Sequence, residues 1–417
     1  MSIISVEKAF KRVQDVEKIS SRKLKFMNLR SSVECGGRER LFILHNDNDV
    51  LITPADDELA PVLGKCKKAG SEVPPALKDW LSVYAEEIRW YQEGGKYTEP
   101  EPLSDTEPDG GQGDEGEQLT NAVNGVAPLT ESTWGQKWPF NKYCKFEGKY
   151  SKVGCPGIAV GQLMYYWAKK GYRRGCIATE AYTSAEKQYA VEAMPAVSKF
   201  DYKNIINGTP LENDQIDAVA KMLAQIGRAL KMDYTPNGSG APLSVIKKQI
   251  VEAFRLCPTV KEMSQKKKGE TKFRNAIISD LKLNRPVLVY GANEANTGAH
   301  IFICDGYDET TDKFHMNWGW FGDFDGWYDL TALGAKFSNG KKAFDFSYNR
   351  WIYYNIQPTY YLGDVNSDNR INMVDVSSAI SDRGRTDAPQ SDVDYDGTVT
   401  MKDVQLITDH ILGKDTL

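Results

Sequence analysis

A tract rich in proline, glycine and acidic residues divides this chain of 417 residues and limits how the rest can fold. Residues 99–117 cannot bury enough apolar surface to offset the entropy of ordering them. We therefore expect an N-terminal unit at 1–95, an acidic disordered linker at 96–119, and a main unit at 120–358. A fourth unit, at 362–417, contains an internal repeat. Exposed linkers of this kind are where proteases cut.

Hydrophobic patterns predict a mixed fold, of the α+β class, for the first two folded units. In the N-terminal unit, apolar runs at 41–45 and 50–53 flank an Asn/Asp turn and predict two strands. Two prolines at 74–75 precede a helical pattern. The main unit combines a helical period at 216–230 with strand-like runs, as at 286–290.

Composition excludes several function classes. The net charge of −5 gives no basic footprint for nucleic acid. No apolar run approaches the roughly 20 residues that span a bilayer, and the first eight residues lack the pattern of a signal peptide. The seven cysteines are odd in number and widely spaced, so neither zinc nor a disulfide framework is expected.

One cysteine, Cys155, has a setting suited to catalysis. It lies in Gly-Cys-Pro at 154–156, directly before an apolar helical run at 157–167. Proline is favoured in the first turn of a helix, so Cys155 should lie at or next to the N-cap. A helix N-terminus and a nearby imidazolium both lower the pKa of a thiol, and the thiolate is the nucleophile. A buried cysteine that begins a core helix fits the local pattern equally well.

The chain has four histidines, and two of them could serve this thiol. His300 precedes an apolar strand and turn at 301–307. His315 and Asn317 alternate along a second strand and share one face. An asparagine beside an imidazole would fix its tautomer. On local grounds either histidine could be the base, although a packed histidine is the simpler interpretation of His315.

A candidate oxyanion donor lies upstream of the thiol. Gln136 follows a Trp-Gly pair in a loop, and its amide could act with the backbone N–H of Cys155. An exposed polar loop residue would give the same local pattern.

Together these motifs resemble the streptopain family of papain-like cysteine peptidases. The resemblance rests on Trp-Gly-Gln at 134–136, Gly-Cys at 154–155, the histidine and strand at 300–307, and Asn-Trp-Gly-Trp at 317–320. It implies a papain-like peptidase of two subdomains. The implied roles are nucleophile for Cys155, general base for His300, oxyanion donor for Gln136, imidazole orientation for Asn317 and shielding for Trp318.

The N-terminal unit resembles the inhibitory prosegment of the same family. The implied mechanism is that of a zymogen, in which the prosegment disturbs the Cys–His geometry until the linker is cut. The main unit departs from the family at Pro156, where small or branched residues are usual. Proline removes one backbone N–H at the helix start, but the N–H of Cys155 remains.

Two repeated loops near the C-terminus predict two calcium ions. Oxygen-bearing side chains occupy positions 1, 3, 5, 9 and 12 of each loop, with a backbone carbonyl at position 7, as calcium requires. The expected ligands are Asp364, Asn366, Asp368, Arg370, Asn372 and Asp375 in the first loop, and Asp392, Asp394, Asp396, Thr398, Thr400 and Asp403 in the second. A helical run follows each loop, at 374–380 and 404–412. One such loop could be a turn without an ion, but two in tandem favour the metal.

No helix pattern precedes either loop, and position 12 is aspartate rather than the EF-hand glutamate. The pair resembles a type I dockerin, which implies an all-α unit that binds a cohesin module of a scaffold protein. The predicted function is a secreted, extracellular cysteine endopeptidase zymogen, acting on protein substrates and tethered through its dockerin. Two alternatives remain: an inactive or inhibitory papain-like binding module, and a transglutaminase-like acyl transferase that uses the same thiol.

Overall fold

The protein is described by a computed structural model. It describes residues 3–17, 28–45, 49–66, 73–93, 125–146, 148–184, 189–257, 259–292, 299–330, 350–358, 363–366, 370–386, 388, 390–394 and 398–414. The predicted linker and the expected ligands Asp368 and Asp396 lie outside these residues.

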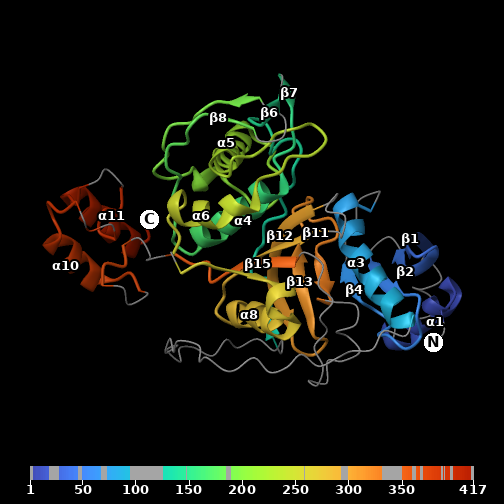
Figure 1. Ribbon diagram of the computed structural model, residues 1–417. Helices are drawn as coiled ribbons and strands as arrows, with labels where there is room; N and C mark the ends of the chain where they lie inside the picture. Colours follow the sequence, from blue (N-terminus) through green and yellow to red (C-terminus); the bar gives the residue numbers. More distant parts are fainter. Residues whose placement is uncertain are drawn as a thin grey trace.

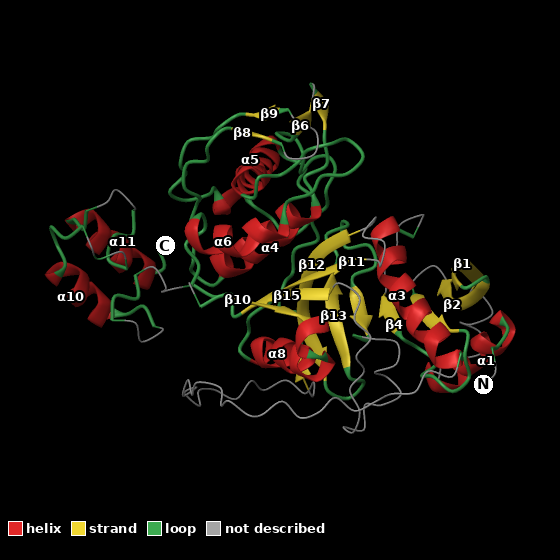
Figure 2. Cartoon of the chain, viewed as in Figure 1, coloured by secondary structure: helices red, strands yellow, loops and turns green. Residues whose placement is uncertain are grey.

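A single antiparallel sheet runs through the N-terminal unit and the main unit (Figures 1 and 2). Its strands are β1 (Asn28–Cys35), β2 (Arg38–His45), β3 (Val50–Pro54), β4 (Gly64–Cys66), β5 (Gly125–Val126), β10 (Lys261–Ser264), β11 (Val287–Ala292), β12 (Ala299–Asp308), β13 (Lys313–Asn317), β14 (Gly326–Tyr328) and β15 (Arg350–Tyr354). Their order is β1-β2-β3-β4-β14-β13-β12-β11-β15-β10, and β5 pairs with β12. The strands predicted at 41–45, 50–53 and 286–290 correspond to β2, β3 and β11.

The two units meet where β4 pairs with β14. Gly64 lies opposite Tyr328 and Cys66 lies opposite Gly326. The N-terminal unit adds two helices, α1 (Val6–Glu17) and α3 (Pro75–Gln92). Leu81 of α3 shares one buried core with Phe302 of β12. The units therefore share a sheet and a core. The boundaries at 95 and 120 remain predictions.

Helices form a second layer, which lies above the sheet in Figure 1. They are α4 (Cys155–Lys169), α5 (Asn213–Ala229) and α6 (Leu243–Glu252), joined by short strands β6 (Lys145–Phe146), β7 (Lys149–Tyr150), β8 (Tyr182–Thr183) and β9 (Ala190–Val191) and a 3-10 turn (Tyr202–Asn204). α4 is buried along almost its whole length. Its apolar side chains pack with Leu223 of α5 and with Ile301 and Ile303 of β12. On the other side of the sheet lies α8 (Glu270–Lys282), which shares a core with Phe302, and the short α7 (Gln265–Lys268) precedes it.

The C-terminal region forms two helices, α10 (Met373–Ser381) and α11 (Met401–Ile411), at the left of Figure 1. They follow the two predicted loops and enclose a small core that includes Val376 and Ile407. Each helix begins with a capping box. Across the described parts of the chain, we find no helix whose length and apolar character suit a bilayer span.

Candidate active site

Cys155 is the first residue of α4, as the sequence predicts, and Gly154 is its N-cap. Gly154 has a φ of +89°. A Cβ there would lie 2.7 Å from Sδ of Met232 and 2.9 Å from the carbonyl oxygen of Ser239. Only glycine fits such a turn, so the residue before the thiol is fixed by backbone geometry. The Cys155 side chain is half-buried.

The loop of Gln136 lies beside the thiol. Its carbonyl accepts a hydrogen bond of 3.0 Å from the N–H of Val153, two residues before Cys155. Trp134 anchors the loop to α4, because its N–H donates to the side-chain oxygen of Gln162 at 3.3 Å. The side-chain amide of Gln136 has no hydrogen-bond partner within the described residues, so it is available to a substrate.

His300 lies on the other face of the sheet from the thiol. Side chains alternate along a strand, and in β12 Ile301 packs on the α4 side while Phe302 packs on the α3 side. The His300 ring stacks with Phe302 at a centroid distance of 5.8 Å and with Trp320 at 4.7 Å. The imidazole is thus held on the face covered by the N-terminal unit, away from Cys155 at the start of α4.

The tautomer of His300 follows from its hydrogen bond. Nε2 lies 2.8 Å from the carbonyl oxygen of Trp318, so Nε2–H donates and Nδ1 remains the basic nitrogen. Asn317 does not make this contact. Its Nδ2 donates to the Ser132 carbonyl at 2.8 Å, and its Oδ1 accepts from Gln162 at 3.1 Å. Asn317 was predicted to orient the imidazole of His300. In this structure the backbone carbonyl of Trp318 has that role, because the Asn317 amide is hydrogen-bonded on the α4 side of the sheet.

Two residues near the predicted set, Gln162 and Trp320, had no role assigned from the sequence. Gln162 links Trp134 to Asn317 and is almost fully buried. Its signal was present, since it is an isolated amide in an otherwise apolar helix. Trp320 forms the closest stacking contact of His300. The ring of Trp318, which was predicted to shield the Cys–His pair, stacks parallel to the ring of Trp320 at a centroid distance of 5.2 Å.

The surroundings of Cys155 and His300 favour the neutral form of each side chain. Desolvation raises the pKa of the Cys155 thiol to about 11, although the backbone N–H groups of Ile301 and Cys155 and the charge of Lys152 act in the opposite direction. Burial lowers the pKa of His300 to about 4, against the effect of its bond to Trp318. The expected lowering of the thiol pKa by the helix start is outweighed by the loss of solvent.

His315, the alternative base, is paired elsewhere. Its Nδ1 lies 2.7 Å from Oδ1 of Asp305, which is fully buried. Burial opposes the charge of His315, but the Asp305 carboxylate outweighs it and raises the pKa of the ring. The other oxygen of Asp305 accepts from the N–H of Thr130 at 2.8 Å. His315 thus anchors a buried network, in line with the simpler interpretation of the sequence.

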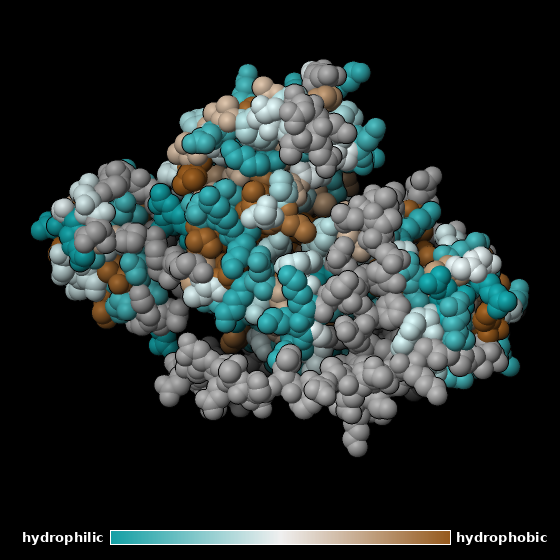
Figure 3. Space-filling model, viewed as in Figure 1, coloured by the Kyte–Doolittle hydropathy of each residue, from teal (hydrophilic) through white to brown (hydrophobic). Residues whose placement is uncertain are grey.

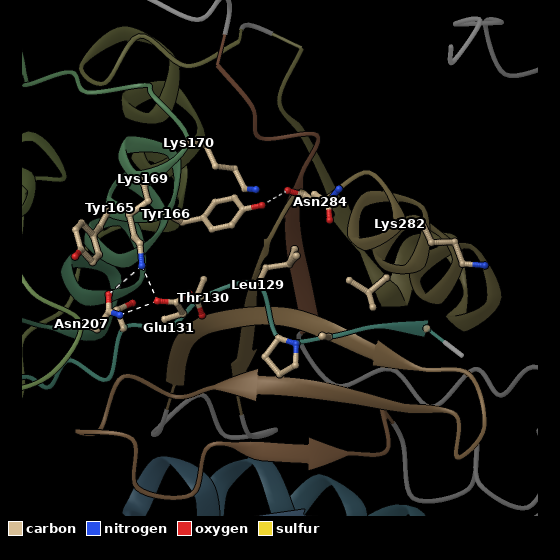
Figure 4. Close-up of a pocket in the computed structure, with 15 residues that line it drawn as sticks. Leu129, Thr130, Glu131, Tyr165, Tyr166, Lys169, Lys170, Asn207, Lys282 and Asn284 are labelled. Carbon is tan, nitrogen blue, oxygen red and sulfur yellow. Dashed lines mark hydrogen bonds and ion pairs between the residues drawn. The ribbon is translucent and has the colours of Figure 1, made fainter. Parts of the chain in front are cut away.

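The pocket drawn in Figure 4 lies at the far end of α4, and its volume is about 620 Å³. Fifteen residues of α-helix span roughly 22 Å, which separates this pocket from the thiol. Several of its polar groups bond to one another: Lys169 and Asn207 donate to Glu131 at 2.6 and 2.7 Å, and Tyr166 donates to the Asn284 carbonyl at 2.5 Å. No cysteine or histidine is among its described lining residues, so it is not the candidate active site.

The second C-terminal loop gathers carboxylates. Asp392, Asp394 and Asp403 bring oxygen atoms within 4.8 Å of one another, a donor set that fits a hard divalent cation. Asp403 also accepts from the N–H of Val393 at 2.8 Å, and Lys402 lies 2.8 Å from Asp394. Asp375 of the first loop is used like Asp403 and accepts from the N–H groups of Val365, Asn366 and Asn372. Calcium at these loops remains a prediction.

A thiol at the start of a buried helix, a glutamine in the neighbouring loop and a histidine on the adjoining strand are the residue types that cysteine peptidases use. The model of the Peptidase C10 family matches residues 134–328, from the loop of Gln136 to the end of β14. The match covers the thiol, the histidine and the Asn-Trp-Gly-Trp motif, and it agrees with the resemblance seen in the sequence.

Similar proteins extend this comparison. The thiol protease/hemagglutinin PrtT of Porphyromonas gingivalis is 25% identical over 320 residues, which cover 71% of this chain and 34% of that protein. Streptopain of Streptococcus pyogenes is 28% identical over 196 residues, which cover 45% of this chain and 48% of streptopain. The chain thus spans about a third to a half of the length of these curated relatives.

A solved structure covers more of the fold. A fragment of Prevotella intermedia prointerpain A aligns over 78% of this chain and 98% of its own, with a TM-score of 0.59 and 20% identity. The likeness at this identity concerns the fold, and its extent takes in more of the chain than the family match.

Proposed function

We propose that the chain is the zymogen of an extracellular cysteine endopeptidase, with Cys155 as nucleophile and His300 as general base. The observation that carries this proposal is the position of Cys155: it begins α4 beside the free amide of Gln136 and next to the strand that bears His300. The family match over residues 134–328 and the thiol protease relative support the same chemistry.

The chemistry follows from the donor and acceptor atoms. Nδ1 of His300 accepts the thiol proton, and the thiolate sulfur attacks the carbonyl carbon of the scissile peptide bond. The amide of Gln136 and the N–H of Cys155 stabilise the oxyanion. His300 then donates its proton to the leaving amine, which leaves a thioester. Water, deprotonated by His300, attacks the thioester and releases the acid and the free thiol.

The N-terminal unit acts as the inhibitory prosegment. The Trp80 ring of α3 packs 5.4 Å from Phe302 and 5.9 Å from Trp318, the aromatic residues that hold His300. The Arg350 guanidinium lies 4.4 Å from the centre of the Trp80 ring. These contacts stabilise the imidazole on the α3 side, where it does not serve the thiol. Cutting the acidic linker and releasing the prosegment would free His300 to turn toward Cys155.

The C-terminal unit acts as a calcium-dependent, dockerin-like tether. Asp392, Asp394 and Asp403, with Asp364 and Asp375 of the first loop, would hold calcium and fix the start of each helix. Apolar side chains are exposed on the helices, including Met373, Val374, Ile380, Met401 and Leu412. Brown patches on this unit in Figure 3 show apolar residues on its surface. Such residues suit a protein partner, here a cohesin module of a scaffold.

The test is hydrolysis of casein, under reducing conditions, by the full-length chain after limited proteolysis has cut its linker. Cys155→Ala should abolish activity and labelling by a thiol alkylator, because the thiolate is the nucleophile. The matched control is Cys257→Ala, another half-buried cysteine. A folded protein without activity after linker cleavage would favour the binding module. Incorporation of an added amine into products, instead of hydrolysis, would favour the acyl transferase.

A further inference from the structure

A group of lysines lies next to the thiol and has no part in the proposed mechanism. Between residues 137 and 152 the sequence has five lysines and one acidic residue, Glu147. Two of the lysines, Lys137 and Lys152, are brought together by the backbone. The bond from the N–H of Val153 to the carbonyl of Gln136 sets the two segments side by side, directly before Cys155.

These two lysines have no acidic partner in the described part of the chain. Lys142 pairs with Asp217, whereas Lys137 is exposed and Lys152 is half-buried without a carboxylate nearby. Burial and the charge of Lys137 both lower the pKa of Lys152, and the sulfur of Cys155 acts in the opposite direction. Two like charges, one of them partly desolvated, are unfavourable unless an anion joins them.

The backbone of Lys152 is held by hydrogen bonds, whereas its side chain is accessible to a ligand. Its backbone is fixed to the loop at 235–240: its N–H donates to the Thr235 carbonyl at 3.1 Å, and its carbonyl accepts from Oγ of Ser239 at 2.7 Å. The same loop is open on its outer side. A Cβ at Gly238 or Gly240 would meet no atom within 4 Å.

We propose that Lys137 and Lys152 form an anionic subsite beside the thiol, which binds acidic side chains of the polypeptide being cleaved. The inference rests on the proposed peptidase function and names its substrate class, acidic extended segments.

An aromatic surface continues from this subsite. Trp138 is 53% exposed and Tyr150 is 51% exposed, and their rings meet edge to face at 5.7 Å. Lys145 lies 5.4 Å from the centre of the Tyr150 ring. Together they offer flat apolar surface and a further charge to residues that flank an acidic side chain.

The chain itself contains a substrate of this class. Residues 99–117 hold eight acidic residues, three prolines and no lysine or arginine. This segment joins the prosegment to the peptidase, so the same subsite would direct self-processing to the linker.

The test uses two internally quenched peptides. One has the sequence of residues 99–117, and in the other every aspartate and glutamate is replaced by asparagine or glutamine. For the full-length chain activated by limited proteolysis, kcat/KM should favour the acidic peptide by roughly fivefold or more, as expected for two partly exposed charge contacts. The preference should weaken as salt is added. Lys152→Gln and Lys137→Gln should bring the ratio toward one, while Lys149→Gln, an exposed lysine of β7, should keep it.

The outcomes separate the two proposals. Equal cleavage of both peptides by the unaltered protein, or an unchanged ratio in Lys152→Gln, overturns the subsite and leaves the peptidase intact. If Lys152→Gln slows both peptides equally and moves thiol alkylation to higher pH, Lys152 acts on the sulfur and the subsite is wrong. If neither peptide nor casein is cleaved, the proposed function itself fails.

Discussion

At the scale of single residues, the site depends on which atoms of each side chain are already bonded. His300 uses Nε2 for the Trp318 carbonyl, so only Nδ1 can accept a proton. Asn317 has its amide bonded to Ser132 and Gln162, which removes it from the imidazole. A backbone carbonyl cannot be changed by substitution, so this means of orienting a histidine is less exposed to mutation than a side-chain amide.

A buried aspartate at the contact between the N-terminal and main units predicts a pH-dependent stability. Burial raises the pKa of Asp329 to about 7, although Lys313 lies 2.8 Å away and opposes the shift. An unfolded aspartate has a pKa of about 3.9, so between about pH 4 and pH 7 the folded protein binds more protons than the unfolded chain. The free energy of unfolding should therefore fall as pH rises through this window.

Replacing this carboxyl tests the assignment. Asp329→Asn keeps a neutral polar side chain and should flatten the fall in stability between about pH 4 and pH 7. Thermal unfolding of the full-length protein across that range is the measurement. Asp323→Asn, at a half-exposed aspartate nearby, is the control. An Asp329→Asn curve with the original slope would remove Asp329 as its source.

At the scale of elements, the sequence pattern predicted the helices whose formation depends on residues close together in the chain. The helix after Cys155, the helix at 216–230 and the start of α3 after two prolines all depend on periodicity or on proline within a few residues, and each forms as expected. The face on which His300 lies could not be read this way. It depends on which side of β12 is covered by α3, a segment more than 200 positions away in the sequence.

Lys152 shows how far the surroundings of the candidate active site can be predicted from the sequence. It lies three positions before the predicted nucleophile, yet nothing in the sequence places it beside Lys137. That proximity arises from the bond between Val153 and Gln136, which is long-range backbone pairing rather than a motif. The motifs predicted the reacting groups, while the charges around them came from tertiary contacts.

The contact of α3 with the aromatic group around His300 predicts how the proposed latency would be lost. Trp80→Ala removes the ring that packs on Phe302 and Trp318, and truncations of buried tryptophan cost about 3–5 kcal/mol. Each 1.4 kcal/mol lost from the inhibited form raises the active population about tenfold. The uncut variant should therefore hydrolyse a small peptide at least tenfold faster than the uncut parent.

The assay is the initial rate, with gels to verify that the linker is intact. Lys78→Ala changes an exposed residue of the same helix and should leave the rate at the parent value. A folded Trp80→Ala protein as inactive as the parent would argue against this contact as the source of latency.

At the scale of the whole molecule, the C-terminal unit has a core of its own around Val376 and Ile407, so the proposed calcium sites would stabilise this unit without acting on the thiol site. Removing calcium with a chelator should unfold α10 and α11, because cation binding and folding of such loops are coupled. Casein hydrolysis should be unchanged, since no residue of this unit is part of the candidate active site. Far-UV circular dichroism and activity on the same sample measure the two effects.

Asp392→Asn should weaken calcium binding in titration calorimetry, whereas Asp409→Asn, in α11 outside the loops, should not. If chelation removed peptidase activity as well as helix content, the C-terminal unit and the peptidase region would not be independent of each other.

The pairing of β4 with β14 has a consequence for the timing of activation. A cut in the linker breaks the covalent connection but leaves the strand pairing and the common core in place. The clipped product would then be a bimolecular complex, subject to mass action. Activity should lag behind the cut in concentrated samples and emerge on dilution, so a high local concentration of the protein would prolong the inactive interval.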